Sequence, residues 1–121
     1  MPKNYRWLIN KTVDYIENHL SEKIRLSDTA HELGVSEYHF HRIYRKSSTE
    51  TLNQFITRIK MERSAMYLLV NSSTTITEIA FRYGYSESSS YNRAFRKHFG
   101  LSPSRFRKEQ EKSIFSNELT V

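Results

Sequence analysis

The stretch YGYSESSSYNRAFRKHFG, residues 83–100, decides the fold of this chain. Its early glycine is typical of a helix end, because glycine readily adopts the left-handed conformation that reverses the chain. Aromatic side chains then recur at helical spacing, at Tyr91 and Phe95. The aromatic spacing indicates a second helix after the glycine. Three consecutive serines, 88–90, lie inside it, although serine contributes little to a core. We therefore expect the serines to lie at or near the outer surface.

The same layout occurs earlier in the chain, in LGVSEYHFHRIYRK, residues 33–46. The two copies are offset by 50 residues at first and by 51 after one inserted residue. The matching pairs are Ala30 and Ala80, Gly34 and Gly84, Ser36 and Ser86, Glu37 and Glu87, Phe40 and Tyr91, Arg42 and Arg93, Tyr44 and Phe95, Arg45 and Arg96, and Lys46 and Lys97. Each copy reads as a helix, a glycine stop, a short turn, a serine cap and a second helix. This is the helix-turn-helix layout, and two copies in register are a stronger signal than one.

Apolar residues outside these copies also recur at helical spacing. A first stripe consists of Ile9, Val13, Ile16 and Leu20. A second stripe indicates a long helix of about 18 residues and consists of Leu52, Phe55, Ile56, Ile59, Met66 and Leu69. At 1.5 Å per residue this helix would be about 27 Å long. We expect helix caps at Ser27, at Thr75 and at Ser102, which precedes Pro103. The chain has only 3 glycines and 2 prolines, which favours helices over strands and turns.

The sequence thus predicts an all-α chain of about seven helices, with two helix-turn-helix subdomains joined by a long connecting helix. We expect the first subdomain at residues 1–50, the connecting helix at 51–71 and the second subdomain at 72–110. Residues 111–121 are expected to form a flexible tail.

Composition restricts the function classes. The 121 residues include 19 Lys+Arg and 13 Asp+Glu, and the net charge of +6 suits a polyanionic partner. The absence of cysteine excludes disulfides and thiolate metal sites. We expect no membrane association and a cytoplasmic location, because no apolar run approaches spanning length and the start lacks a secretory apolar core.

The second helix of each copy has one apolar and one polar face. Phe40, Ile43 and Tyr44 are expected to point inward in the first copy, as are Tyr91, Ala94 and Phe95 in the second. The outward positions match between the copies: Tyr38, His41, Arg42 and Arg45 in the first, and Ser89, Asn92, Arg93 and Arg96 in the second. Any amphipathic surface helix has a solvated polar face. Arginine at the same point of both copies nevertheless favours DNA contact, with each helix in the major groove.

Three stretches resemble the DNA-binding domain of the AraC/XylS family of bacterial transcription regulators, in particular its short activators. They are LSDTAHELGVSEYHFHRIYRK (26–46), TLNQFITRIKMERSAMYLL (51–69) and ITEIAFRYGYSESSSYNRAFRKHFGLSPSRFR (76–107). The resemblance covers roughly residues 6–108 and implies two helix-turn-helix subdomains bound to one DNA duplex. It implies base reading by Tyr38, His41, Arg42, Ser88, Ser89, Asn92 and Arg93. We expect phosphate contacts from Ser36, Arg45, Lys46, Ser86, Arg96 and Lys97.

The family resemblance further implies an activator that contacts RNA polymerase, acting at the bacterial nucleoid. A stiff connector could place the two helices near successive major-groove segments, which recur about every 34 Å, so that one monomer reads an asymmetric site. The length fits either a stand-alone regulator or the DNA-binding part of a longer protein. A helical domain that binds an acidic protein instead of DNA remains a second interpretation.

An enzyme is not expected. The chain has no phosphate-cradling glycine loop. The close histidine pair, His39 and His41, falls on different faces of a helix, which makes metal binding a poor interpretation. We therefore expect no catalytic residues, no cofactor and no metal ion.

Overall fold

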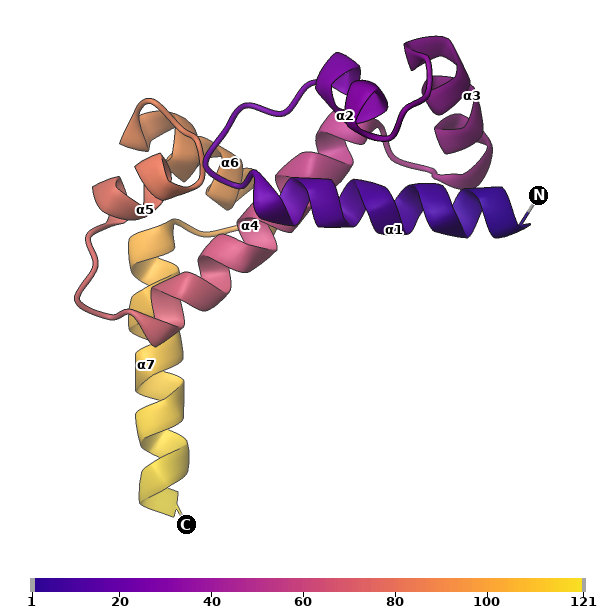
Figure 1. Cartoon of the computed structure of the whole chain (residues 1–121). Coiled ribbons are helices and arrows are strands. Elements are labelled where there is room, and N and C mark those ends of the chain that lie inside the picture. Colours follow the sequence, from indigo (N-terminus) through magenta and orange to yellow (C-terminus); the bar gives the residue numbers. More distant parts are fainter. Residues whose placement is uncertain (1, 121) are drawn as a thin grey trace. The chain divides into compact units, whose positions relative to one another are not determined.

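A computed structural model describes the backbone of residues 2–120 and the side chains of residues 6–46 and 48–112. Within this part the chain forms seven helices and no strands, which confirms the all-α prediction (Figure 1). The helices are α1 (Pro2–Asn18), α2 (Leu26–Glu32), α3 (Glu37–Ser47), α4 (Leu52–Val70), α5 (Ile76–Arg82), α6 (Ser88–Phe99) and α7 (Pro103–Thr120). The chain divides into two compact units, residues 1–59 and 60–121, so that each unit takes part of α4.

The first unit packs α1 against α2 and α3 (Figure 1). Its buried apolar cluster consists of Leu8, Ile16, Ile24, Ala30, Phe40, Tyr44, Phe55, Ile56 and Ile59. The predicted first stripe packs on this cluster, with Ile16 fully buried and Ile9, Val13 and Leu20 half-buried, and the structure adds Leu8 and Thr12, which are fully buried. Thr12 fits this position because its hydroxyl donates a hydrogen bond to the Leu8 carbonyl at 2.6 Å.

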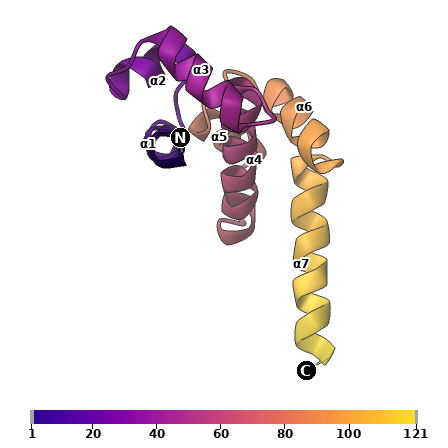
Figure 2. The same cartoon turned by 90° about the vertical axis from the view of Figure 1, so that its right-hand side faces the viewer.

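In the second unit α6 packs against α5 and α7, and Figure 2 shows α7 following directly from the end of α6. The buried apolar residues are Met61, Ala65, Leu68, Ile79, Ala80, Tyr83, Tyr91 and Phe95. The Phe106 ring of α7 contacts the Phe95 ring, with centroids 5.4 Å apart. The placement of Met66 in the apolar stripe of α4 is wrong, since this side chain is 58% exposed. The inward face of α4 follows Met61, Ala65 and Leu68 instead.

Of the three helix caps predicted outside the serine turns of the two copies, two are confirmed. The Thr75 hydroxyl accepts a hydrogen bond from the Glu78 backbone N–H at 3.1 Å, at the start of α5. Ser102 does the same for the Arg105 N–H at 3.2 Å, at the start of α7. These side chains satisfy N–H groups that have no partner within the helix.

The predicted cap at Ser27 is wrong. Helix α2 begins at Leu26 and its N-cap residue is Arg25, two residues before the predicted cap. The hydrogen-bonded ladder starts there because the Thr29 N–H donates to the Arg25 carbonyl at 3.1 Å. The Thr29 hydroxyl donates to the same carbonyl at 3.0 Å.

Helix α4 begins with a capping box that the sequence reasoning did not include. The Gln54 N–H donates to the Thr51 hydroxyl at 3.1 Å, and the Thr51 N–H donates to the Gln54 side-chain oxygen at 2.9 Å. This reciprocal pair fixes where the connecting helix starts.

The predicted subdomain limits and the flexible tail stay predictions. Helix α7 extends through Thr120. The side chains of residues 113–121, which make up most of the predicted tail, lie outside the described residues.

Candidate nucleic-acid interface

Both helix-turn-helix units contain the same glycine turn between their two short helices. The four backbone hydrogen bonds are Gly34 N–H to His31 O at 3.0 Å, Val35 N–H to Ala30 O at 3.0 Å, Gly84 N–H to Phe81 O at 3.1 Å and Tyr85 N–H to Ala80 O at 3.0 Å. This pattern is the Schellman motif, which needs a left-handed residue after the helix. Gly34 and Gly84 supply it, with φ of 71° and 85°. A Cβ atom at Gly34 would meet no heavy atom within 4 Å, so the backbone conformation and not the space requires glycine.

The second helices of the two copies, α3 and α6, begin differently, and they are called the recognition helices below because they are the ones expected to contact DNA. The Ser36 hydroxyl caps α3 by accepting a hydrogen bond from the backbone N–H three residues further on, at 3.1 Å. The matching cap predicted at Ser86 is wrong, because α6 begins at Ser88 and its N-cap residue is Glu87. The inserted residue therefore lies in the turn before α6, and Glu87 takes the position that Ser36 has in the first unit.

Helix α3 presents its predicted polar face to solvent. Tyr38 is 77% exposed, and His41 and Arg42 are exposed beside it. The opposite side is closed by Phe40 and Tyr44, which are 0% and 3% exposed. Arg45 and Lys46, in the last turn, are also exposed, as is Ser36 before the helix. All the residues predicted to contact DNA in this unit are thus accessible.

Helix α6 has the same division into faces. Tyr91 and Phe95 are fully buried, whereas Arg93 is exposed on the other side. The remaining exposed residues among those predicted to contact DNA are Ser86, Ser89, Arg96 and Lys97. Ser88 and Asn92 are half-buried, and so is Ser90. Of the three serines, Ser89 therefore faces the solvent most fully.

Local hydrogen bonds engage the donors at the start of α6. The Ser89 hydroxyl donates to the Glu87 carboxylate at 3.3 Å, and the Asn92 amide nitrogen donates to the Ser88 carbonyl at 2.8 Å. Sequence reasoning did not count Glu87 as part of this surface. The one-residue change of offset between the copies was the signal that could have placed it there.

A buried tyrosine holds α6 onto α4 within the second unit. The Tyr91 hydroxyl donates to Ser64 Oγ at 2.8 Å, and the Ser64 hydroxyl donates to the Met61 carbonyl at 2.9 Å. Burial raises the pKa of Tyr91 to about 12, although the bond to Ser64 acts in the opposite direction. The phenol therefore stays protonated and able to donate at neutral pH.

The first unit also anchors its recognition helix through a tyrosine. The Tyr44 hydroxyl donates to the Thr51 carbonyl at 3.3 Å, just before α4, and receives a hydrogen bond from the Ser48 hydroxyl at 3.3 Å. The Tyr44 ring lies 6.2 Å from that of Phe55. Both recognition helices thus have one exposed cationic face and one anchored aromatic face.

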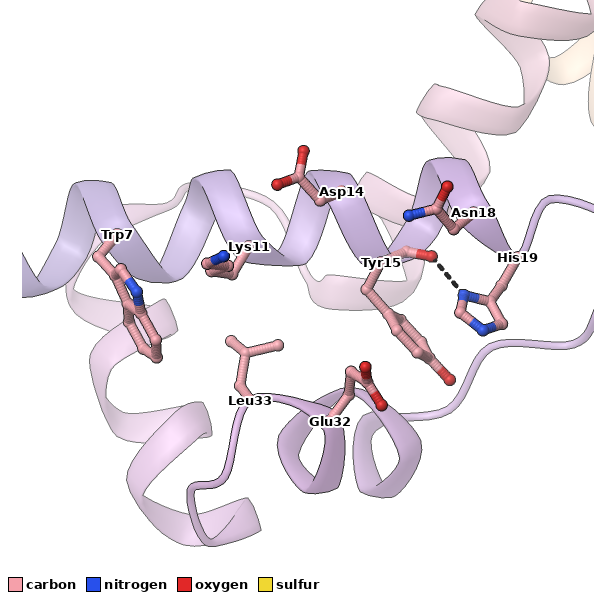
Figure 3. A pocket seen from close by; sticks show the side chains of 8 residues that line it. All are labelled: Trp7, Lys11, Asp14, Tyr15, Asn18, His19, Glu32 and Leu33. Atoms are coloured by element: carbon pink, nitrogen blue, oxygen red, sulfur yellow. Dashed lines mark hydrogen bonds between the residues drawn. The ribbon is translucent and has the colours of Figure 1, made fainter.

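A hollow on the first unit lies between α1 and the end of α2 (Figure 3). The side chains of Trp7, Tyr15 and Leu33 point into it, and Tyr15 stacks on His19 with centroids 4.1 Å apart. No residue of α3 lines this hollow. The residues predicted to contact DNA therefore lie outside it.

The described residues contain neither a candidate metal site nor a candidate membrane span. No group of three or more His, Cys, Asp or Glu side chains there could hold a metal ion. No helix in that part of the chain has the length and apolar character needed to cross a bilayer.

Comparison with known proteins shows a clear family match. A family described as a helix-turn-helix domain matches residues 29–109. The Msm operon regulatory protein of Streptococcus mutans is 36% identical over 101 residues, which are 84% of this chain and 36% of that protein. The chain thus spans only about a third of the length of this relative.

Solved structures agree with this match. The C-terminal domain of AraT, a response regulator from Geobacillus stearothermophilus, is 30% identical with a TM-score of 0.75, covering 84% of each chain. The DNA-binding domain of AdpA, a global transcriptional factor solved in complex with a target DNA, has a TM-score of 0.73 at 23% identity, covering 86% of this chain and 93% of that one. These proteins are regulators and not enzymes, which confirms the expectation of a non-enzymatic chain.

Proposed function

Because the chain belongs to the AraC/XylS family of helix-turn-helix transcription regulators, we propose that it reads a specific double-stranded DNA site with two helices. In this proposal α3 and α6 enter successive segments of the major groove. The other helices of each unit hold them against the duplex.

The observation that carries the proposal is the matched position of two arginines. Arg42 and Arg93 are exposed, and each lies on the side of its helix opposite two buried aromatic residues. A guanidinium group can bond both acceptors of guanine, O6 and N7, in the major groove. The net charge of +6 supports the approach to the phosphate backbone.

The other exposed side chains divide into two roles. Bases would be contacted near the arginines by Tyr38, His41, Ser88, Ser89 and Asn92. Phosphates would be contacted by Ser36, Arg45, Lys46, Ser86, Arg96 and Lys97, which flank those positions. The first group would carry sequence preference, and the second would carry affinity and its dependence on salt.

We further propose that one chain binds as a monomer and acts as an activator that contacts RNA polymerase at the bacterial nucleoid, in the cytoplasm. The monomer proposal rests on the presence of both recognition helices in one chain, connected through α4. The activator and polymerase roles rest on the family alone.

Selection of bound duplexes from a random pool, at one stated salt concentration, tests the proposal. The expected result is a site with two preferred segments about one helical turn apart. Arg105→Ala serves as the matched control, since it removes one exposed arginine of α7 outside both recognition helices and should leave the selected site unchanged. Binding of all sequences with a steep salt dependence but no preferred site would contradict the proposal and favour a domain that binds acidic partners in general.

A further inference from the structure

We propose that Arg107, on α7, is a positioning residue that sets the placement of α6 for DNA reading by holding the turn between α4 and α5. The inference rests on the proposed function, because it concerns how precisely α6 is presented to the bases. Arg107 would act through backbone groups and not by touching DNA itself.

The guanidinium group of Arg107 donates to three backbone carbonyls of another segment. Its Nε donates to Leu68 O at 3.1 Å, its Nη2 to Asn71 O at 3.1 Å and its Nη1 to Thr74 O at 2.8 Å. The side chain is half-buried. Hydrogen bonds from a charged donor are stronger than neutral ones, and the planar fork of arginine can reach three acceptors that a lysine could not satisfy together.

These carbonyls lie at a point where two helices meet. Leu68 belongs to the last turn of α4, whose carbonyls have no partner within the helix. Asn71 lies in the turn that follows, and Thr74 directly precedes Thr75, the cap of α5. Arg107 therefore joins the end of one helix, the turn and the start of the next.

The first turn of α7 directs the Arg107 side chain towards the turn between α4 and α5. Pro103, at the first position of the helix, is buried, and Arg107 follows four residues later on the same face. Phe106, its neighbour, packs its ring against Phe95 of α6, with centroids 5.4 Å apart. The residue that binds the turn is thus next to a residue that contacts the recognition helix.

The elements that Arg107 connects are those that support α6. Helix α5 packs against α6, and α4 bonds to it through Ser64 and Tyr91 at 2.8 Å. A shift of the turn would therefore move the supports of α6 within the second unit. The geometry of a base contact is sensitive to such shifts, whereas a flexible contact to phosphate is much less so.

The test uses the full chain with Arg107→Lys, which keeps the charge but lacks the fork, and Arg105→Lys as the matched control on an exposed arginine of the same helix. Binding is measured on the selected DNA site and on sites altered in either half. The half read by α6 is identified as the one in which Arg93→Ala weakens the sequence preference. We expect Arg107→Lys to lose discrimination in that half by at least about fivefold, the lower end of what one base pair contributes. Discrimination in the other half and the salt slope should not change.

Thermal unfolding of each variant gives the folded fraction, which is used to correct the binding data. Amide hydrogen exchange of residues 71–75 provides a second measurement, and we expect faster exchange in Arg107→Lys than in Arg105→Lys. Unchanged discrimination, or a loss that is equal on all sequences, would overturn the positioning role. Failure of the wild-type chain to select any site would instead refute the proposed function, and hydrogen exchange would still show whether Arg107 holds the turn.

Discussion

Tyr91 donates its phenolic hydrogen to Ser64 Oγ at 2.8 Å across 27 residues of sequence. The bond lies on the buried side of α6, opposite the exposed Arg93. The Tyr91 ring also packs against the rings of Tyr85 and Phe95, with centroids 5.6 and 5.8 Å away, whereas its hydroxyl reaches α4. A directional bond of this kind restricts how α6 can rotate on its support, which aromatic packing alone does less strictly.

The contribution of this bond to stability can be measured with Tyr91→Phe. The substitution removes one hydroxyl from a buried site, and Ser64 keeps its bond to the Met61 carbonyl. We expect the free energy of unfolding to fall by about 0.5–1.5 kcal/mol, as measured by urea denaturation. Tyr38→Phe is the matched control, because its hydroxyl belongs to a side chain that is 77% exposed. Equal stability of the two variants would show that the bond to Ser64 contributes nothing.

The raised pKa of Tyr91 predicts that the folded state loses stability at alkaline pH. Burial raises the pKa of Tyr91 to about 12 in the folded state, whereas an unfolded tyrosine titrates near pH 10, about its unperturbed value. The stabilisation is therefore fully present below pH 10 and is lost as the pH rises from about 10 towards 12. Burial also raises the pKa values of Tyr83 and Tyr85, which act in the same direction.

The difference between wild type and Tyr91→Phe isolates the Tyr91 contribution to this pH dependence. Urea denaturation from pH 8 to 11 should show a shallower alkaline decline for the variant. A decline of equal steepness in both proteins would mean that Tyr91 does not titrate on unfolding.

Lys97 should contribute affinity without sequence preference. It is exposed in the last turn of α6, where a phosphate contact is proposed. We expect Lys97→Ala to weaken binding to all duplexes about equally and to reduce the slope of log affinity against log salt by about 1. Lys11→Ala, on α1, is the control with the same loss of charge and should have a smaller effect. A selective loss on some sequences would assign Lys97 to base reading instead.

Glu87 should have the opposite effect on binding. Its exposed carboxylate lies at the start of α6, where it would repel phosphates and could accept a hydrogen bond from cytosine N4. We expect Glu87→Gln to raise affinity for mixed-sequence DNA by about fivefold, on the order of 1 kcal/mol for one surface charge. Titration with a mixed-sequence duplex checks this, with Glu111→Gln on α7 as the control. Weaker binding by Glu87→Gln would refute the repulsion.

The features of the fold that depend on local sequence could be predicted. Helical spacing placed Phe40 and Tyr91 inside and Arg42 and Arg93 outside, and the glycines marked the helix ends. The start of α6 could not be placed from a serine match, because the hydrogen-bond ladder begins at Glu87. Propensity for a cap is a local property, whereas the residue at which a ladder starts also depends on how the helix packs.

Long-range polar contacts could not be predicted at all. In the sequence Ser64 looks like an ordinary polar residue of α4, and only the structure shows that it accepts a hydrogen bond from Tyr91. In the sequence Arg107 likewise cannot be told from an ordinary surface arginine, because its three carbonyl partners lie 33 to 39 residues away. Such partners become visible only when the helices have been packed in space.

The central question is whether α3 and α6 read separate halves of one DNA site. It is answered by selecting bound sequences with Arg42→Ala and with Arg93→Ala and comparing each result with that of the wild type. We expect each variant to relax the preference in a different half of the site, with a cost of about 1–3 kcal/mol at the contacted base pair. If both variants relax the same positions, or lose affinity equally on every sequence, the two helices do not read separate halves of one duplex.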